Sequence, residues 1–470
     1  MKSVLKSRVG VLMIELIEIA ERARTGQRLE EKKWNLSLFR KMQELIKEYD
    51  LSSRGVEEFI NTDDRLADDA FEAALDFIVD VGAYCITTNR VIRFEEEEVR
   101  KAIREAPNQV SMGEGRDARV FKQGIVDGCK QININPGHHA PFTEDLGPLV
   151  AKNFAQIPRT DFIEGFNFPS VDGRDIYDQP LEAYAAIREV ACMREGVRKA
   201  GRPGLAIVLY PISTKASSLI APMNPKLGLR PTDGLLMSTL PDVKVEYDHI
   251  TTAIVFSNYG YFAVNGSFGM AGGFCGGPEG AMIEGIVRPI IGYMTYGDSL
   301  HYTGVEHLAY VMGERIVLHP VNWARSVVYQ ALYRNTNMIY MEWNITCSGL
   351  CTETGLLENA LRSVEATVNG AALYAPRVSR AQMNAGQTPV EPEFMIEVSD
   401  ATVKAKLKRE EAGKILQQIA DRLKGQSPEK GKTIQECYDL VKHKPSNEYQ
   451  EIYRKVKKYL VNLGLEFQYT

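Results

Sequence analysis

Residues 266–280 read GSFGMAGGFCGGPEG, and this stretch carries more glycine than a regular helix or strand tolerates. Seven of its fifteen residues are glycine. Glycine adopts positive φ readily, and it lets a backbone approach a ligand closely or point successive amides at one spot. The stretch is therefore predicted to be an irregular loop, which is either a tight structural corner or a binding loop. A nucleotide phosphate loop is disfavoured, because neither the GxxxxGK[ST] lysine nor a clean GxGxxG spacing is present.

The segments around this loop alternate between helical and strand patterns. Residues 245–265 are typical of a helix that leads into a strand, and residues 281–296 are long and apolar enough for a buried helix. Further along, NMIYMEWNI at 337–345 is an apolar run, and residues 356–370 have helical periodicity with a glycine stop at Gly370. Repeated strand, loop and helix units favour a parallel α/β sheet.

The composition excludes several classes of protein. The chain has 470 residues, of which 44% are hydrophobic and 25% are charged, as in a soluble globular protein with a large core. A formal net charge of -5 gives no electrostatic footprint for nucleic acid. No apolar run reaches the roughly 18 uncharged residues of a membrane span. Seven scattered cysteines do not form a secreted disulfide framework, so the cytoplasm is the expected compartment.

Three regions are predicted along the chain. Residues 1–110 are expected to be a helical N-terminal region, and sheet structure is expected to begin with a hairpin or first strand pair within residues 111–124. Residues 111–375 are interpreted as the α/β core. Residues 376–470 are charged and helical, and they are expected to complete the surface of the core.

Histidine and cysteine pairs near the glycine loop are candidate functional groups. His301 and His307 flank Gly304, which suggests a loop, and histidines hydrogen-bonded within a packed loop are the favoured interpretation. Cys347 and Cys351 form a Cys-x3-Cys pair that falls within the loose range of zinc-ligand spacings. Buried or redox-neutral cysteines are favoured over a zinc site, because no second clustered pair is present.

Acidic and aromatic residues lie at the predicted ends of the strands. The candidate acids for acid/base chemistry are Glu279, Glu284, Glu342 and Glu353, each of which is more typical of a cap or an ion-pair partner. The aromatic residues at the same ends are Tyr210, Phe274, Tyr302 and Trp343. Such a group usually belongs to a core, but at the mouth of a barrel it could surround a cationic methyl group through cation–π attraction.

The chain resembles the monomethylamine methyltransferases of methanogenic archaea, from the GQRLEEKKWN segment at Gly26 almost to its C-terminal end. The resemblance is carried by FINTDD at Phe59, GAYCITTNRVIRFEEEEV at Gly82, GRDA at Gly115, AGRPG at Ala200, GGFCGG at Gly272, HYTGVEH at His301 and CSGLCTETGLLE at Cys347.

This resemblance implies a (β/α)8 TIM-type barrel with N- and C-terminal helical additions, and a homo-oligomer. It also implies transfer of a methyl group from a small methylated substrate to the cob(I)alamin of a separate corrinoid protein, with no bound metal in the enzyme. The loops that follow the strands of such a barrel carry the active site. The positions expected to face the corrinoid are Gly272, Gly273, Gly276, Gly277, His301, His307, Cys347, Cys351 and Glu353.

Departures from the family pattern are concentrated at its reactive positions. The family's signature residue is pyrrolysine, an imine that captures methylamine, and its register falls here on Val208. Lys215 lies seven residues further on, too far to stand for a pyrrolysine unless the register shifts. Other pocket positions of the family also differ here. Leu236 and Gly266 stand where the family has glutamates, Trp343 where it has a glutamine, and Ile345 where it has a tyrosine. Aliphatic side chains cannot form an adduct with methylamine.

The expected activity is therefore corrinoid methyl transfer from a donor other than methylamine. A quaternary amine suits a less polar pocket, because positive charge already activates its methyl group and no imine is needed. The expected substrate pocket comprises Tyr210, Leu236, Gly266, Phe274, Tyr302, Trp343 and Ile345. Two alternatives remain: a non-catalytic paralogue that binds a corrinoid protein or a small apolar ligand, and a methyltransferase that uses a zinc-activated thiol or alcohol.

Overall fold

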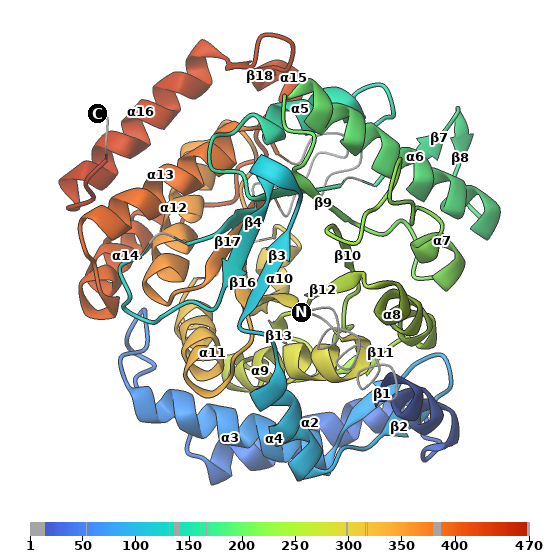
Figure 1. Ribbon diagram of the computed structural model, residues 1–470. Coiled ribbons are helices and arrows are strands. Elements are labelled where there is room, and N and C mark those ends of the chain that lie inside the picture. Colours follow the sequence, from blue (N-terminus) through green and yellow to red (C-terminus); the bar gives the residue numbers. More distant parts are fainter. Residues whose placement is uncertain are drawn as a thin grey trace.

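The centre of the molecule is an eight-stranded parallel sheet that curls into a barrel (Figure 1). The computed structural model describes residues 15–52, 54–130, 132–135, 142–165, 167–297, 299–314, 316, 318–378 and 387–467. In chain order the barrel strands are β5 (Ile134–Asn135), β6 (Phe162–Glu164), β9 (Ala206–Leu209), β10 (Gly234–Leu236), β12 (Phe262–Gly266), β14 (Leu300–Thr303), β16 (Tyr340–Thr346) and β17 (Ala372–Val378).

Asp161 joins the two edge strands of this sheet. Its backbone amide donates to the Ile134 carbonyl over 3.0 Å, and its carboxylate Oδ2 accepts from the Ile134 amide over 2.9 Å. These two bonds bring the start of β6 against β5, so the barrel is nearly closed. The predicted (β/α)8 fold is confirmed.

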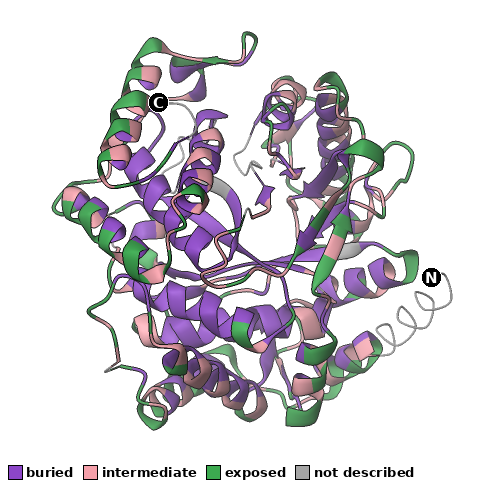
Figure 2. Ribbon diagram, turned by 60° about the vertical axis from the view of Figure 1, so that its left-hand side comes forward, coloured by how far each residue is buried: buried purple, intermediate pink, exposed green. Residues whose placement is uncertain are grey.

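Helices follow the strands around the outside of the barrel, and Figure 2 shows that their inward faces are buried against it. They are α5 (Gly147–Ala155), α6 (Gln179–Lys199), α7 (Ala216–Ile220), α8 (Tyr247–Tyr259), α9 (Pro278–Tyr296), α11 (Val321–Asn335), α12 (Glu353–Val368) and α13 (Val390–Lys404). The helix-to-strand transition predicted for residues 245–265 is confirmed by α8 and β12. The part of the chain that the structure describes contains no helix long and apolar enough to cross a membrane.

The N-terminal region is helical, but it also contains a small sheet that the sequence did not reveal. Its helices are α2 (Glu31–Glu48), α3 (Asp64–Asp80) and α4 (Glu96–Glu105), and its strands are β1 (Ala83–Cys85) and β2 (Arg90–Ile92). Strand β1 pairs in parallel with β11 (Lys244–Val245), which lies in the segment after β10. The expectation that sheet begins only after residue 110 was wrong, because three-residue strands show no clear alternation and form here through tertiary pairing.

A hairpin closes the amino end of the barrel, as predicted for this part of the chain. It consists of β3 (Gln109–Met112) and β4 (Arg119–Lys122), joined by the 3₁₀ turn Gly115–Asp117. Phe121 of the hairpin packs edge-on against Phe162 at the start of β6, with ring centroids 5.3 Å apart. The hairpin crosses in front of the barrel strands in Figure 1. The hairpin therefore fills the amino end of the barrel with packed side chains.

The remaining elements extend the loops and cover the outside of the barrel. The loop elements are β7 (Ser170–Val171), β8 (Arg174–Asp175), β13 (Gly269–Ala271), β15 (Val305–His307) and α10 (Leu308–Val311). The C-terminal elements are α14 (Arg409–Leu423), α15 (Ile434–Cys437), β18 (Tyr438–Asp439), β19 (Lys444–Pro445) and α16 (Asn447–Asn462).

A group of five charged side chains is buried between the barrel wall and its helices, and we call it the buried charge network. Its members are Arg325, Arg362, Glu306, Glu342 and Glu365, of which no side chain is more than 3% exposed. Arg362 pairs with Glu306 and, over 2.7 Å, with Glu342, while Arg325 pairs with Glu365 over 2.9 Å. The network joins β15, β16, α11 and α12.

Removing one partner of this network should strongly destabilise the protein. Arg362→Met is expected to lower the free energy of unfolding by about 3–5 kcal/mol, because buried carboxylates then lose their counter-charge. Urea denaturation monitored by circular dichroism measures this change. Lys414→Met is the control, because its pair with Glu410 is largely exposed and should contribute little. Equal effects of the two substitutions would contradict the role assigned to the network.

Candidate active site at the carboxyl end of the barrel

Alternate residues of each barrel strand point inward, and these inward side chains form one apolar cluster that runs from the amino-end hairpin to the carboxyl ends of the strands. It includes five of the residues expected to form the site: Val208, Leu236, Tyr302, Trp343 and Ile345. Tyr210 packs against the same cluster. A Cβ at Gly266 would lie 3.1 Å from Leu236 Cδ1, so Gly266 is part of the same surface. Phe274 is not, because it is 53% exposed on the glycine-rich loop.

Val208 lies in the barrel wall between β6 and β10. It pairs with Glu164 on one side and with Gly234 on the other, and it is fully buried. Its isopropyl group can neither bond covalently to an amine nor exchange a proton. Lys215, seven residues further on, directs its ammonium to Asp248 of α8, with which it pairs over 3.3 Å.

Four aromatic rings gather in this inner surface, and we call them the aromatic cluster: Phe268, Tyr302, Trp343 and Tyr374. The Tyr302 and Tyr374 rings stack with centroids 4.1 Å apart. Trp343 stands edge-on to Tyr374 at 5.9 Å and to Phe268 at 5.2 Å. Phe268 and Tyr374 were not among the predicted site residues. Ring faces assembled in this way can attract a cation.

Glu164, at the end of β6, places one carboxyl group beside the aromatic cluster. Its side chain is fully buried and accepts a hydrogen bond from the Tyr374 hydroxyl. Burial raises the pKa of Glu164 well above its ordinary value. The sequence analysis missed this acid, although FIEG, a short apolar run that ends in an acid before glycine, resembles a strand with a polar group at its carboxyl end.

A second buried acid lies behind the end of β6. Glu189 of α6 is fully buried, and neither of its carboxyl oxygens bonds to any of the residues described. A Cβ at Gly165, the residue after Glu164, would lie 2.6 Å from Glu189 Oε1. Burial, and then the charge of Glu164, raise the pKa of Glu189 well above its ordinary value. This part of the barrel therefore holds two carboxyl groups that favour the protonated form.

The glycine-rich stretch is a corner packed against its own helix. Part of it is regular, since residues 269–271 form β13, which pairs with β15, and α9 begins at Pro278. A Cβ at Gly269 would lie 1.7 Å from the Ala281 carbonyl oxygen, and one at Gly280 would lie 1.9 Å from the Cys275 carbonyl oxygen. Only glycine fits at these two positions, so close packing accounts for the glycines at 269 and 280.

Backbone amides of the turn inside this corner donate hydrogen bonds to carbonyl groups of the same corner. Gly272, Gly273, Gly276 and Gly277 connect β13 to α9, and Gly272 and Gly276 have φ of 89° and 92°. The Gly272 amide donates to the Gly276 carbonyl over 2.8 Å, and the Gly273 amide donates to the Met270 carbonyl over 3.0 Å. These amides therefore do not converge on a ligand, and the structural-corner interpretation fits the geometry.

The two candidate histidines have different environments. His301 is not in a loop as expected; it lies in β14 and points out of the barrel, where its ring meets Tyr340 at 5.6 Å. Burial lowers the pKa of His301 to about 3. His307 ends β15 near the glycine-rich turn, and its Nδ1 accepts from the Ala309 amide over 3.1 Å. Only His307 lies in a loop that could meet a partner.

Cys347, Cys351 and Glu353 lie after β16 but do not share one surface. Cys347 belongs to the apolar cluster inside the barrel, whereas Cys351 packs in the outer core. Burial raises the pKa of Cys351 to about 11. Glu353 pairs with Arg422 of α14 and Lys455 of α16, and so connects α12 to the C-terminal helices. Among the described residues, no group of three histidine, cysteine or acidic side chains could hold a metal ion.

Known proteins match this chain over nearly its whole length. The family model described as "Monomethylamine methyltransferase MtmB" matches residues 14–465. The chain belongs to the monomethylamine methyltransferase family. It is 28% identical over 454 residues to monomethylamine methyltransferase MtmB2 of Methanosarcina acetivorans, covering 95% of this chain and 97% of that relative. It has the same identity and coverage with MtmB1 of Methanosarcina barkeri.

Solved structures of the monomethylamine methyltransferase family superpose closely on this chain. The crystal structure of the Methanosarcina barkeri monomethylamine methyltransferase gives a TM-score of 0.89 at 26% sequence identity. The comparison covers 96% of this chain and 98% of that one. A hydroxylamine complex of MtmB matches with the same values. The barrel, its closing hairpin and the terminal helices are therefore features of a family fold.

Two glycine substitutions test the packing of the glycine-rich corner. Gly269→Ala is expected to lower the free energy of unfolding by about 1–3 kcal/mol, because the new Cβ collides with the Ala281 carbonyl. Gly413→Ala is the control, because Gly413 lies inside α14 and a Cβ added there would have no neighbouring atom within 4 Å. It should raise the free energy of unfolding by about 0.5–1 kcal/mol. Thermal and urea unfolding measure both, and a harmless Gly269→Ala would contradict the packing argument.

The buried acid on α6 should make stability fall as pH rises. Because the pKa of Glu189 is higher in the folded protein, the folded state holds its proton where the unfolded state releases it. The stabilising contribution of the Glu189 carboxyl group is fully present below the pKa that it has in the unfolded chain. It is lost as pH rises from that value through the higher pKa of the folded state. Glu189→Gln is therefore expected to unfold at a higher urea concentration than the parent at pH 8, with the difference shrinking toward pH 4.5. Glu195→Gln, on the same helix but half-exposed, should show no such pH dependence.

Proposed function

We propose that this protein transfers a methyl group from a small quaternary ammonium donor to the cob(I)alamin of a separate corrinoid protein. Membership of the monomethylamine methyltransferase family supports the reaction class. The observation that supports the donor class is the aromatic cluster with Glu164 beside it at the carboxyl end of the barrel. Aromatic faces and a carboxylate together suit a permanent cation that has no N–H group to donate.

The pyrrolysine position supports the choice of donor. A primary amine must be captured and activated before its methyl group can leave, and Val208 offers no group for this. A quaternary ammonium carries its positive charge permanently, so its nitrogen is already a competent leaving group. We therefore propose that the reaction proceeds without pyrrolysine.

The chain's own residues would bind and orient the donor. Trp343 and Tyr374 would face the cation, and Glu164 would balance its charge after losing its proton. The corrinoid supplies the cobalt nucleophile. As the methyl group moves to cobalt, the carbon–nitrogen bond breaks, its electron pair stays on nitrogen, and a neutral tertiary amine leaves. The protein's contribution is to hold the methyl group toward the open end of the barrel, where a corrinoid protein can reach it.

A cob(I)alamin assay tests this proposal. The protein is mixed with photochemically reduced cob(I)alamin and, separately, tetramethylammonium, choline, glycine betaine, methylamine, a methylated thiol or a methoxy compound. Loss of the cob(I)alamin absorption band is expected with a quaternary amine and not with methylamine. Trp343→Leu should weaken donor use about 30-fold, because a desolvated cation–π contact contributes about 2 kcal/mol.

Two further variants sharpen this test. Glu164→Gln keeps the shape of the side chain but removes its charge, and it should also reduce donor use. Phe274→Leu changes an exposed aromatic residue outside the aromatic cluster and should leave the rate unchanged. Turnover with methylamine, or with the thiol alone, would refute the proposed donor. Binding of quaternary amines without turnover, with a corrinoid protein present, would favour the non-catalytic paralogue.

A further inference from the structure

A cavity of about 620 Å³ opens beside the amino end of the barrel, away from the aromatic cluster. Its wall is formed by β4, by residues 123–125, 130, 132 and 133, and by the chain just before β6 and around the start of β17. Phe121 and Phe162 fill the barrel at this end, so they separate the cavity from the inner surface that carries Trp343. Nothing in the proposed methyl transfer uses this cavity.

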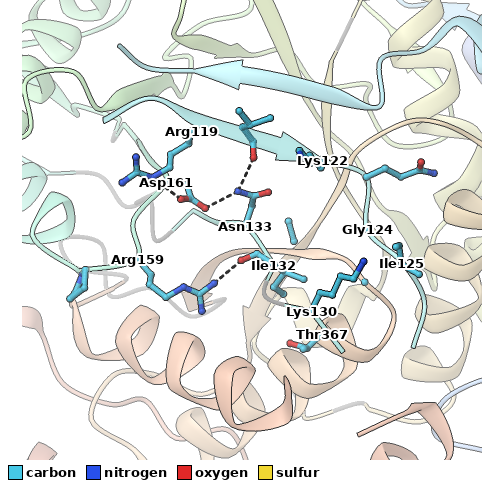
Figure 3. Close-up of a pocket in the computed structure, with 15 residues that line it drawn as sticks. Arg119, Lys122, Gly124, Ile125, Lys130, Ile132, Asn133, Arg159, Asp161 and Thr367 are labelled. Carbon is cyan, nitrogen blue, oxygen red and sulfur yellow. Dashed lines mark hydrogen bonds and ion pairs between the residues drawn. The ribbon is translucent and has the colours of Figure 1, made fainter. Parts of the chain in front are cut away.

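Five charged side chains line the cavity, and four of them are cations: Arg119, Lys122, Lys130 and Arg159, with Asp161 as the acid. Two of the cations already have counter-charges. Arg119 pairs with Asp161 over 3.3 Å, and Arg159 pairs with Asp400 of α13. Figure 3 shows Arg119, Asp161 and Asn133 joined along one side of the cavity, with Lys122 and Lys130 on the other side.

The two lysines carry charge that no described residue neutralises. Within the described part of the chain, the side chains of Lys122 and Lys130 have no ion pair or hydrogen bond, whereas Arg119 and Arg159 are held by carboxylates. Once these two ion pairs are set aside, the cavity wall carries two positive charges. The Asp161 carboxylate cannot supply more compensation, because it also accepts from the Ile134 amide and the Asn133 side chain.

We propose that this cavity binds a small anion with two negative charges, carried by phosphate or carboxylate groups. Its volume falls in the range of about 300–1,000 Å³ that is typical of small-molecule sites. Lysine ammonium groups bind phosphate as point charges, and their long side chains can adjust to the ligand. The two arginines, held by their carboxylates, would define the shape of the far wall. The site is independent of the methyl donor and of the corrinoid.

Isothermal titration calorimetry of the full-length protein tests this proposal, with pyrophosphate and succinate as separate probes. At low salt, saturable binding of one probe per chain is expected. The double variant K122Q/K130Q should weaken it about 100-fold, because two charge-assisted hydrogen bonds to the anion are lost. Both lysines are exposed, so the variant should fold normally, which circular dichroism would check.

A second double variant controls for net charge. K32Q/K226Q removes the same two charges from exposed lysines that do not line the cavity, and it should bind the probes like the parent. Preference for pyrophosphate would assign a phosphate ligand, and preference for succinate would assign a dicarboxylate. The proposal is overturned if neither probe binds saturably, or if both double variants weaken binding equally. None of these outcomes depends on methyl transfer, so this site and the proposed function are tested separately.

Discussion

The buried charge network between β15, β16, α11 and α12 is the constraint on which the carboxyl end of the barrel depends. Charges removed from water are costly unless they are paired with good geometry, so the network admits few arrangements of these four elements. Glu342, which joins it, is the residue before Trp343 in β16. Because alternate residues of a strand point to opposite faces, holding Glu342 outside the barrel turns Trp343 inward. The aromatic cluster is thus positioned by charges on the other side of the wall.

Acids on the barrel helices fix the neighbouring loops in the same way. Glu284 of α9 accepts from the amides of Met270 and Asp242 over 3.1 and 2.7 Å, which holds the loops after β12 and β10. Glu358 of α12 accepts from the Ser348 hydroxyl over 2.7 Å and from the Cys347 amide. These carboxylates satisfy backbone donors that would otherwise be buried without partners. The loops after β10, β12 and β16 are therefore each held by a helix carboxylate where they leave the strands.

The two ends of the barrel differ in chemistry. At the carboxyl end, aromatic rings with the Glu164 carboxyl group beside them form the inner surface proposed to bind a cation. At the amino end, a hairpin fills the barrel and a cavity with excess positive charge lies beside it. The family fold is retained at 28% sequence identity to its relatives, and in the register proposed above Val208 takes the pyrrolysine position. Transfer of a methyl group from a different donor, as proposed, would require the same barrel with different side chains in its pocket.

The sequence by itself determined the fold class, because helical and strand periods recur in order and the family motifs extend along the chain. It also indicated that four candidate acids are caps or ion-pair partners, and the structure confirms this for Glu284, Glu342 and Glu353; for Glu279 it stays a prediction. Only the tertiary structure decided that Tyr374 lies between Glu164 and Trp343, bonded to the first and packed on the second, since these residues come from three different strands. It also turned His301 out of the barrel, because side-chain direction in a strand depends on register, which pairing with neighbouring strands sets and local sequence does not.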